Sequence, residues 1–212
     1  MINVANVVTV SRVGVALGAI ALLWWNADVW RWTAFGITAF VIYADALDGY
    51  LARKLNQASK FGGILDIAGD RAVEMCYWVA FCALGWIPAW IPILFVIRGT
   101  FVDAVRSFAS DKGYTAFGAK TMMQSPVGKF LVASNFSRFT YAVAKAVAFC
   151  LLIAAHTTLG TTYGVMTIAM AFVYVSCAFC VVRGLPVLFE STFLFVGSTN
   201  AAQAEVEKQH TT

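Results

Sequence analysis

Residues 45–70 read DALDGYLARKLNQASKFGGILDIAGD and contain the features that decide the fold. Asp45 and Asp48 are three residues apart, and Asp66 and Asp70 are four residues apart. Both separations place two side chains on one face of a helix. An ionised carboxylate in apolar surroundings is costly unless it is paired or bound to a metal. The stretch therefore predicts two helices that each present two carboxylates, which together suit hard divalent cations, either Mg²⁺ or Mn²⁺.

The composition around this stretch is that of an integral membrane protein. Of the 212 residues, 60% are hydrophobic and only 12% are charged, whereas about a quarter of the residues of a soluble domain are charged. The net charge of +4 is modest, and we expect no nucleic-acid partner. The composition excludes an ordinary soluble enzyme and predicts that membrane lipids surround the chain.

Apolar runs of about 20 residues, the length that crosses a bilayer, predict an all-α, multi-pass protein with six transmembrane helices. We place them at 6–25, 32–54, 63–85, 89–110, 136–156 and 162–183. Residues 111–135 are polar and predict a loop with a short interfacial helix. We expect one membrane domain over residues 1–197 and a polar C-terminal tail over residues 198–212.

The distribution of basic residues predicts the orientation in the membrane. Arg31 is the only Lys or Arg in three short connections, which lie near residues 26–31, 85–88 and 156–161. The opposite side contains Arg53, Lys54, Lys60, Lys112, Lys120, Lys129 and Arg183. Because cytosolic loops carry an excess of Lys and Arg, we expect both termini and the acidic site to face the cytosol, with a bacterial inner membrane as the location.

The stretch also resembles in full the signature of the CDP-alcohol phosphotransferase (CDP-alcohol phosphatidyltransferase) family. The matching positions are Asp45, Asp48, Gly49, Ala52 and Arg53, and after eight residues Gly62, Asp66 and Asp70. The resemblance implies transfer of a phosphatidyl group from a CDP-linked lipid, such as CDP-diacylglycerol, to a small polar alcohol or alcohol phosphate with release of CMP. It also implies a homodimer.

The same resemblance implies roles for individual residues. All four aspartates would hold two Mg²⁺ or Mn²⁺ ions, and Asp70 would also take the proton of the incoming hydroxyl. The CDP-lipid would contact two groups of residues: Asn6, Val7, Val8 and Thr9 near the N-terminus, and Gly49, Arg53, Ser59 and Gly62 within or beside the signature.

Basic residues further along the chain are candidates for binding the acceptor. Arg98 and Arg106 lie eight apart on one predicted helix, and Arg138 and Lys145 lie seven apart on another. Ionisable residues at membrane depth are functional candidates by default. This arrangement loosely resembles phosphatidylglycerophosphate synthases, which implies glycerol 3-phosphate as the acceptor. An inositol phosphate or serine is the alternative within the family, and pairing with Glu74 is the alternative role for Arg98 and Lys145.

Two functions of other classes are also compatible with a cluster of acids in the membrane. A divalent-cation transporter could use the carboxylates as an ion path. A structural membrane protein could merely pair them with Arg12, Arg53 and Arg71. The acids lie close to one end of their predicted helices, and only Glu74 continues the series toward the other end. This pattern favours the transferase.

Overall fold

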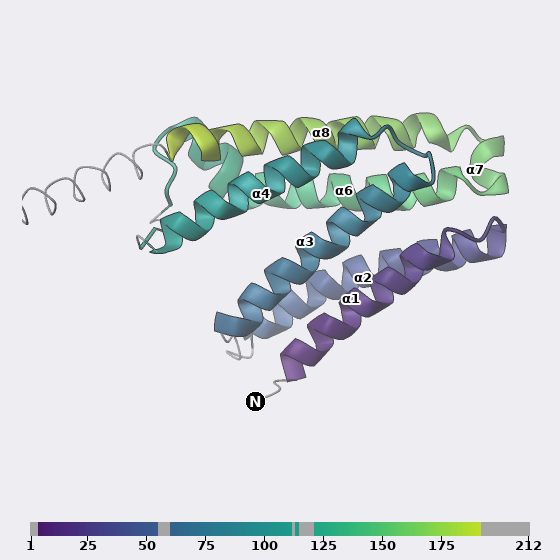
Figure 1. The fold of residues 1–212 in the computed structure, drawn as a ribbon, viewed down its shortest axis with the longest axis horizontal. Coiled ribbons are helices and arrows are strands. Elements are labelled where there is room, and N and C mark those ends of the chain that lie inside the picture. Colours follow the sequence, from purple (N-terminus) through teal and green to yellow (C-terminus); the bar gives the residue numbers. More distant parts are fainter. Residues whose placement is uncertain (1–3, 55–59, 112, 115–120, 192–212) are drawn as a thin grey trace, which may run out of the picture. The chain divides into compact units, whose positions relative to one another are not determined.

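The structure is a computed structural model that describes residues 4–54, 60–111, 113–114 and 121–191, with side chains except at 4–6, 45–54 and 60–61. These residues are almost entirely helical (Figure 1). The elements are α1 (Val4–Leu22), α2 (Asp28–Lys54), α3 (Lys60–Ala83), α4 (Trp90–Asp111), α5 (Pro126–Gly128), the π-helix η1 (Lys129–Ala133), α6 (Asn135–Ala155), α7 (Thr158–Thr162) and α8 (Val165–Glu190).

The six long helices α1, α2, α3, α4, α6 and α8 coincide with the six predicted spans, so the prediction of an all-α chain is confirmed. The short helix predicted within residues 111–135 is also present, as α5 and η1. Among the described residues, α6 and α8 are long and apolar enough to cross a membrane, and Val7–Leu22 forms a shorter apolar helix. Membrane crossing by all six helices and the orientation of the termini stay predictions.

Local chemistry explains where several helices begin and end. Asp28 begins α2, where its negative charge complements the positive end of the helix dipole. After α3, Gly85 has a φ of +73°, which favours glycine. At this point the backbone N–H of Trp86 donates to the carbonyl of Phe81 at 2.8 Å and closes the helix end. The chain can then turn into α4.

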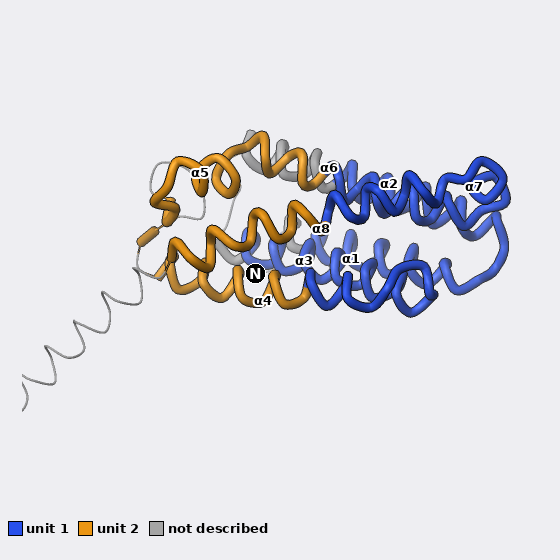
Figure 2. The backbone as a smooth tube through the Cα atoms, turned by 90° about the horizontal axis from the view of Figure 1, so that it is seen from above, with its two compact units in different colours: residues 1–95, 143–176 blue, residues 96–142, 177–212 orange. Residues whose placement is uncertain are grey.

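The chain divides into two compact units, shown in different colours in Figure 2. Unit 1 comprises residues 1–95 and 143–176, and unit 2 comprises residues 96–142 and 177–212. In unit 1, α1 packs against both α2 and α3. Aromatic side chains fill the core of this unit: Trp78 stacks on Phe95 with ring centroids 4.5 Å apart, and Tyr77 stacks on Phe149 at 5.0 Å. The two stacks join α3 to α4 and to α6.

Three connections of unit 1 are tied together by polar and aromatic contacts. The rings of Trp86 and His156 stack with centroids 3.8 Å apart. Arg31 donates to the carbonyl of His156. The carboxylate of Asp28 accepts the backbone N–H of Thr158 at 3.0 and 3.1 Å, at the start of α7. These contacts fix the ends of α1, α3 and α6 relative to the helices that follow them.

Unit 2 has its own apolar core and its own polar clamp. Its buried apolar cluster consists of Val102, Ala109, Met122, Met123, Val132 and Val187. Near the end of α8, the carboxylate of Glu190 accepts hydrogen bonds from the backbone N–H groups of Gln124 (2.8 Å) and Ser125 (3.0 Å). The Ser125 hydroxyl also donates to Glu190 and caps α5 through the N–H of Gly128. Glu190 therefore holds the segment that leads into α5 and η1.

We predict that acid destabilises the cluster around His156. Burial, assisted by the nearby charge of Arg31, lowers the pKa of His156 below its usual 6.5, although its hydrogen bond to the Leu152 carbonyl acts in the opposite direction. A histidine whose folded pKa is depressed contributes stability that is present above the unfolded pKa and is lost as the pH falls through the folded pKa. Thermal unfolding in detergent between about pH 8 and pH 5 should show a falling midpoint for the wild type and a smaller fall for His156→Asn. Equal slopes for the two proteins would contradict this assignment.

Candidate active site

A close contact between α1 and α3 places the two described aspartates of the signature. A Cβ atom at Gly69 would lie 3.1 Å from Val13 Cγ2 and 3.5 Å from Thr9 Cγ2. A contact of 3.1 Å is tight, so Gly69 allows α1 to approach α3 more closely than alanine would. As a result Thr9, a predicted contact of the CDP-lipid, lies beside the helical turn that carries Asp66 and Asp70.

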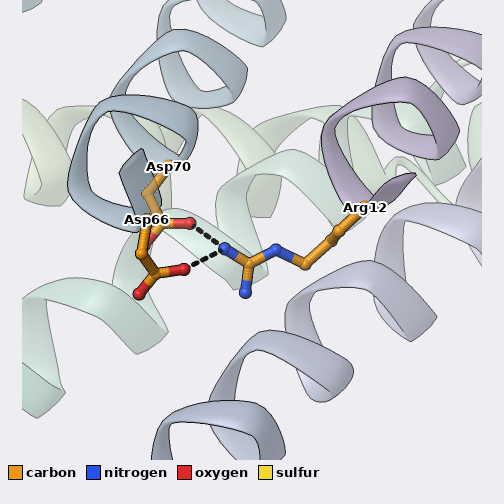
Figure 3. A network of polar contacts seen from close by, with 3 residues as sticks. All are labelled: Arg12, Asp66 and Asp70. Atoms are coloured by element: carbon orange, nitrogen blue, oxygen red, sulfur yellow. Dashed lines mark hydrogen bonds and ion pairs between the residues drawn. The ribbon is translucent and has the colours of Figure 1, made fainter. Parts of the chain in front are cut away.

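Arg12 of α1 bridges these two aspartates (Figure 3). Its Nη2 atom is 2.9 Å from Asp66 Oδ1 and 2.5 Å from Asp70 Oδ1. The Arg12 side chain is only 8% exposed, whereas those of Asp66 and Asp70 are 46% and 47% exposed. One buried guanidinium thus offsets one of the two negative charges of carboxylates that remain open to their surroundings on another side.

The arrangement of Asp66 and Asp70 fits a divalent cation. Their Oδ1 atoms converge on a single point, which the positively charged nitrogen of Arg12 occupies. Carboxylate oxygens are the ligands that Mg²⁺ and Mn²⁺ prefer. Two carboxylates alone do not complete a metal site, and the described residues contain no group of three or more Asp, Glu, His or Cys side chains that could hold a metal. The side chains of Asp45 and Asp48 lie outside the described part.

The other predicted residues of the CDP-lipid site are described to different extents. Asp45, Asp48, Gly49 and Arg53 lie on the last turns of α2, and Gly62 lies in the first turn of α3. On α1, Val7 and Val8 are exposed. The side chains of Asn6, Asp45, Asp48 and Arg53, and the whole of Ser59, fall outside the described residues. The structure thus brings Thr9, Asp66 and Asp70 together, while the roles assigned to these and to the other residues stay predictions.

Lys145, one of the predicted acceptor residues, has an acidic partner in unit 1. Its Nζ atom is 2.7 Å from Glu74 Oε2, and Arg71 Nη1 is 3.2 Å from the same oxygen. The side chain of Glu74 is 10% exposed and that of Lys145 is 17% exposed. The alternative role considered for Lys145, neutralisation by Glu74, is therefore what the structure shows. Arg98 belongs to unit 2, and its pairing with Glu74 stays a prediction.

In unit 2, two buried arginines share one aromatic ring. Arg98 is 9% exposed and Arg183 is 4% exposed, and their guanidinium carbons lie 5.9 and 5.6 Å from the centre of the Tyr141 ring. A Cβ at Gly184 would lie 2.9 Å from Arg98 Cγ, so this glycine makes room for the arginine stem. The cation–π contacts compensate part of the cost of burying two positive charges.

Arg183 holds the segment before α6. It donates to the carbonyl oxygens of Leu131 at 2.6 Å and Val132 at 3.2 Å, and to the hydroxyl oxygen of Ser137 at 2.5 Å. Ser137 in turn donates to the Leu131 carbonyl at 2.7 Å. Although the sequence analysis counts Arg183 among the cytosolic basic residues, the structure buries it in a structural role.

Arg106 and Arg138, the other two predicted acceptor residues, also belong to unit 2. Arg106 is partly buried on α4, and Arg138 is exposed in the first turns of α6. Lys145 belongs to unit 1. An acceptor pocket that includes all four basic residues therefore stays a prediction.

Sequence reasoning missed two residues that shape these sites, Gly69 and Arg183. Gly69 directly precedes Asp70 but is not one of the fixed positions of the signature. A small residue beside a functional acid was the available signal for a close helix contact. Arg183 lies in an apolar helix next to Gly184, and this neighbour was the corresponding signal for a buried base. Neither signal indicates which helix packs against the residue.

Comparison with known proteins gives the following similarities. The sequence model described as CDP-alcohol phosphatidyltransferase matches residues 2–182. A "CDP-diacylglycerol--glycerol-3-phosphate 3-phosphatidyltransferase" of Cereibacter sphaeroides is 34% identical over 116 residues, which cover 52% of each chain. A protein of the same name from Pseudomonas fluorescens is 32% identical over 163 residues, covering 71% of this chain and 82% of the relative.

A third relative differs in the acceptor that its name contains. A "CDP-diacylglycerol--inositol 3-phosphatidyltransferase" of Schizosaccharomyces pombe is 34% identical over 83 residues, covering 38% of this chain and 32% of the relative. The chain thus spans about half the length of the Cereibacter relative and less of the fission-yeast one. The resemblance stated from the signature is confirmed.

We predict that Glu74 and Lys145 depend on each other for stability. Glu74→Gln leaves the largely buried Lys145 without its carboxylate partner, and breaking such a pair costs about 3 kcal/mol of unfolding free energy. The double variant Glu74→Gln with Lys145→Met should recover much of this loss. Thermal unfolding in detergent measures both, with Glu74→Gln combined with Arg98→Met as the matched control. Recovery in the control but not in the Lys145 variant would overturn the pairing.

Proposed function

Because the chain belongs to the CDP-alcohol phosphatidyltransferase family, we propose that it transfers the phosphatidyl group of CDP-diacylglycerol to glycerol 3-phosphate and releases CMP. The observation that carries the proposal is the convergence of Asp66 and Asp70 on one cationic nitrogen beside Thr9. Two of the relatives are named for this acceptor. An inositol phosphate or serine is the alternative acceptor.

The reaction is a displacement at the phosphorus atom that carries the diacylglycerol. The acceptor hydroxyl oxygen forms a new bond to this phosphorus, the bond to the bridging oxygen breaks, and CMP leaves with the electron pair. Asp70 takes the proton of the attacking hydroxyl and later returns it to water. Because its carboxylate is about half exposed, a hydroxyl group can reach it.

The four aspartates would hold two Mg²⁺ or Mn²⁺ ions, which would neutralise the diphosphate and stabilise the attacking and leaving oxygens. Two groups of residues would contact the CDP-lipid. The nucleotide would be contacted from α1 by Asn6, Val7, Val8 and Thr9. The nucleotide and diphosphate would be contacted by Gly49, Arg53, Ser59 and Gly62. Arginine suits this task because its planar guanidinium binds phosphate through two parallel hydrogen bonds.

The proposed contacts for the phosphate of the acceptor are Arg98, Arg106, Arg138 and Lys145. Lys145 also forms an ion pair with Glu74. Arg98 supports this proposal because its buried Nε atom has no hydrogen-bond acceptor in the described residues. An anion that reached this atom would satisfy it. The chain would work as a homodimer of six-span subunits in a bacterial inner membrane, with the site open to the cytosol, where a polar acceptor is dissolved.

An acceptor screen tests the proposed function. Purified protein receives CDP-diacylglycerol, Mg²⁺ or Mn²⁺, and in separate reactions glycerol 3-phosphate, inositol phosphate, serine or no acceptor. We expect CMP release only with glycerol 3-phosphate and no release in excess EDTA. Release with another acceptor would reassign the substrate. Cation flux through liposomes without any CMP release would favour the transporter.

We predict that Asp70→Asn abolishes transfer but largely preserves CDP-lipid binding. Asparagine keeps the shape of the side chain but cannot accept a proton, and a general base contributes about 10²- to 10⁴-fold to the rate. Asp45→Asn, which removes a proposed metal ligand without removing the base, should weaken CDP-lipid binding as well. Rate and binding measurements on both variants separate the two roles. Equal binding losses with only mild rate losses would show that the division of roles is wrong.

A further inference from the structure

Arg12 carries a charge that is shielded from its surroundings and directed at two acids. Its side chain is 8% exposed, and one nitrogen, Nη2, contacts both Asp66 and Asp70. Two carboxylates four residues apart on a helix repel each other when neither is neutralised. The guanidinium, with its single positive charge, reduces this repulsion.

We propose that Arg12 is the resident cation of the acid pair in the metal-free protein, and that a divalent metal ion must displace it. The inference rests on the proposed function in one respect: it requires that Asp66 and Asp70 bind such an ion. The juxtaposition of Arg12 with both carboxylates is the observation that carries it (Figure 3).

Arg12 and a metal ion cannot occupy the same place. The nitrogen lies 2.9 and 2.5 Å from the two Oδ1 atoms. A metal held by both oxygens on the side of Arg12 would lie about 2.0 to 2.6 Å from each, almost at the position of the nitrogen. Overlap of the two atoms and repulsion of their charges make the two cations exclusive. Arg12 consequently lowers the affinity for the metal, and by linkage the metal weakens the hold of Arg12 on α3.

Displacement takes the guanidinium of Arg12 away from Asp66 and Asp70. Burial of a cation is strongly unfavourable unless anions lie close by, and the stem of Arg12 begins on α1 one turn after Thr9. The charge is best satisfied by oxygens of a diphosphate that arrives at the same site, because guanidinium groups bind phosphate through paired hydrogen bonds. Arg12 thereby couples binding of the metal to binding of a diphosphate ligand.

Titration with Mn²⁺ tests the displacement directly. Purified wild type, Arg12→Gln, Arg12→Lys and the control Arg71→Gln are titrated in detergent, each without nucleotide and with CDP as the diphosphate probe. Arg71 is a suitable control because it follows Asp70 directly but contacts Glu74 at 3.2 Å.

For Mn²⁺ alone, we expect Arg12→Gln to bind about ten-fold more tightly than the wild type, the low end of what charge-assisted hydrogen bonds contribute, because the carboxylates are half exposed. Arg12→Lys should lie between the two, and Arg71→Gln should stay close to the wild type. CDP should tighten Mn²⁺ binding to the wild type more than to Arg12→Gln. Unchanged or weaker Mn²⁺ binding by Arg12→Gln, or an equal gain in Arg71→Gln, would overturn the proposal.

Thermal unfolding provides a second readout if Arg12→Gln folds poorly without metal. The metal-free variant should unfold at a lower temperature than the wild type, and Mn²⁺ should raise its midpoint by more than it raises that of the wild type. Equal increments would contradict displacement. Since neither measurement uses CDP-diacylglycerol or an acceptor, failure of the displacement leaves the transferase assay unaffected. Absence of saturable Mn²⁺ binding in all four proteins would overturn both the displacement and the metal assignment.

Discussion

In unit 1, the need to neutralise charge between apolar helices determines how α1 meets α3. Asp66 and Asp70 project from α3 with a single base, Arg12, between them. For that base to reach both, α1 has to approach closely, and Gly69 permits the approach by presenting no Cβ to Val13. The ion pairs of Arg12 thus depend on the absence of a side chain at Gly69, which allows the two helices to come close. Thr9 is carried to the same place because it lies one turn before Arg12 on α1. The helix contact, the partly neutralised acid pair and the position of the predicted nucleotide segment all follow from this constraint.

The same constraint separates the other basic residues into groups with different tasks. Lys145 shares the carboxylate of Glu74 with Arg71, so its charge is balanced within the protein. Arg183 binds two carbonyl oxygens and a hydroxyl group that would otherwise lack donors. Arg98 differs from both, because its described contact is with the face of the Tyr141 ring; its Nε atom, like that of Arg183, is buried without an acceptor among the described residues. An aromatic ring stabilises a cation less than a carboxylate does. Arg98 is therefore the buried base in unit 2 whose surroundings leave the most to gain from an anion.

The sequence predicted the helices well because apolar runs and polar interruptions are local properties. All six long helices, and the short one before α6, lie where hydropathy places them. The common face of Asp66 and Asp70 was also predictable, since a separation of four residues fixes it, whereas that of Asp45 and Asp48 stays a prediction. What could not be predicted is the rotation of each helix about its axis, which decides the partners. The sequence offered Arg98 and Lys145 as partners of Glu74, and the packing of α3 against α6 places Lys145 beside it. The burial of Arg183 could not be predicted for a related reason, because its position near the end of an apolar run is equally compatible with an exposed interface and with a buried contact; its placement on the cytosolic side stays a prediction.

The asymmetry of exposure around the acid pair gives the site a direction. The guanidinium of Arg12 approaches from the protected side, where its side chain is 8% exposed, while the two carboxylates keep nearly half of their surface open. A hydroxyl group that arrives from outside meets the carboxylates first and Arg12 last, so Arg12 leaves the open face of Asp70 accessible. A divalent ion held by both Oδ1 atoms competes with Arg12 instead, because the guanidinium nitrogen already contacts the same two oxygens. In the proposed displacement, Arg12 therefore holds the acid pair before a ligand arrives, and the metal takes over this task once it has bound.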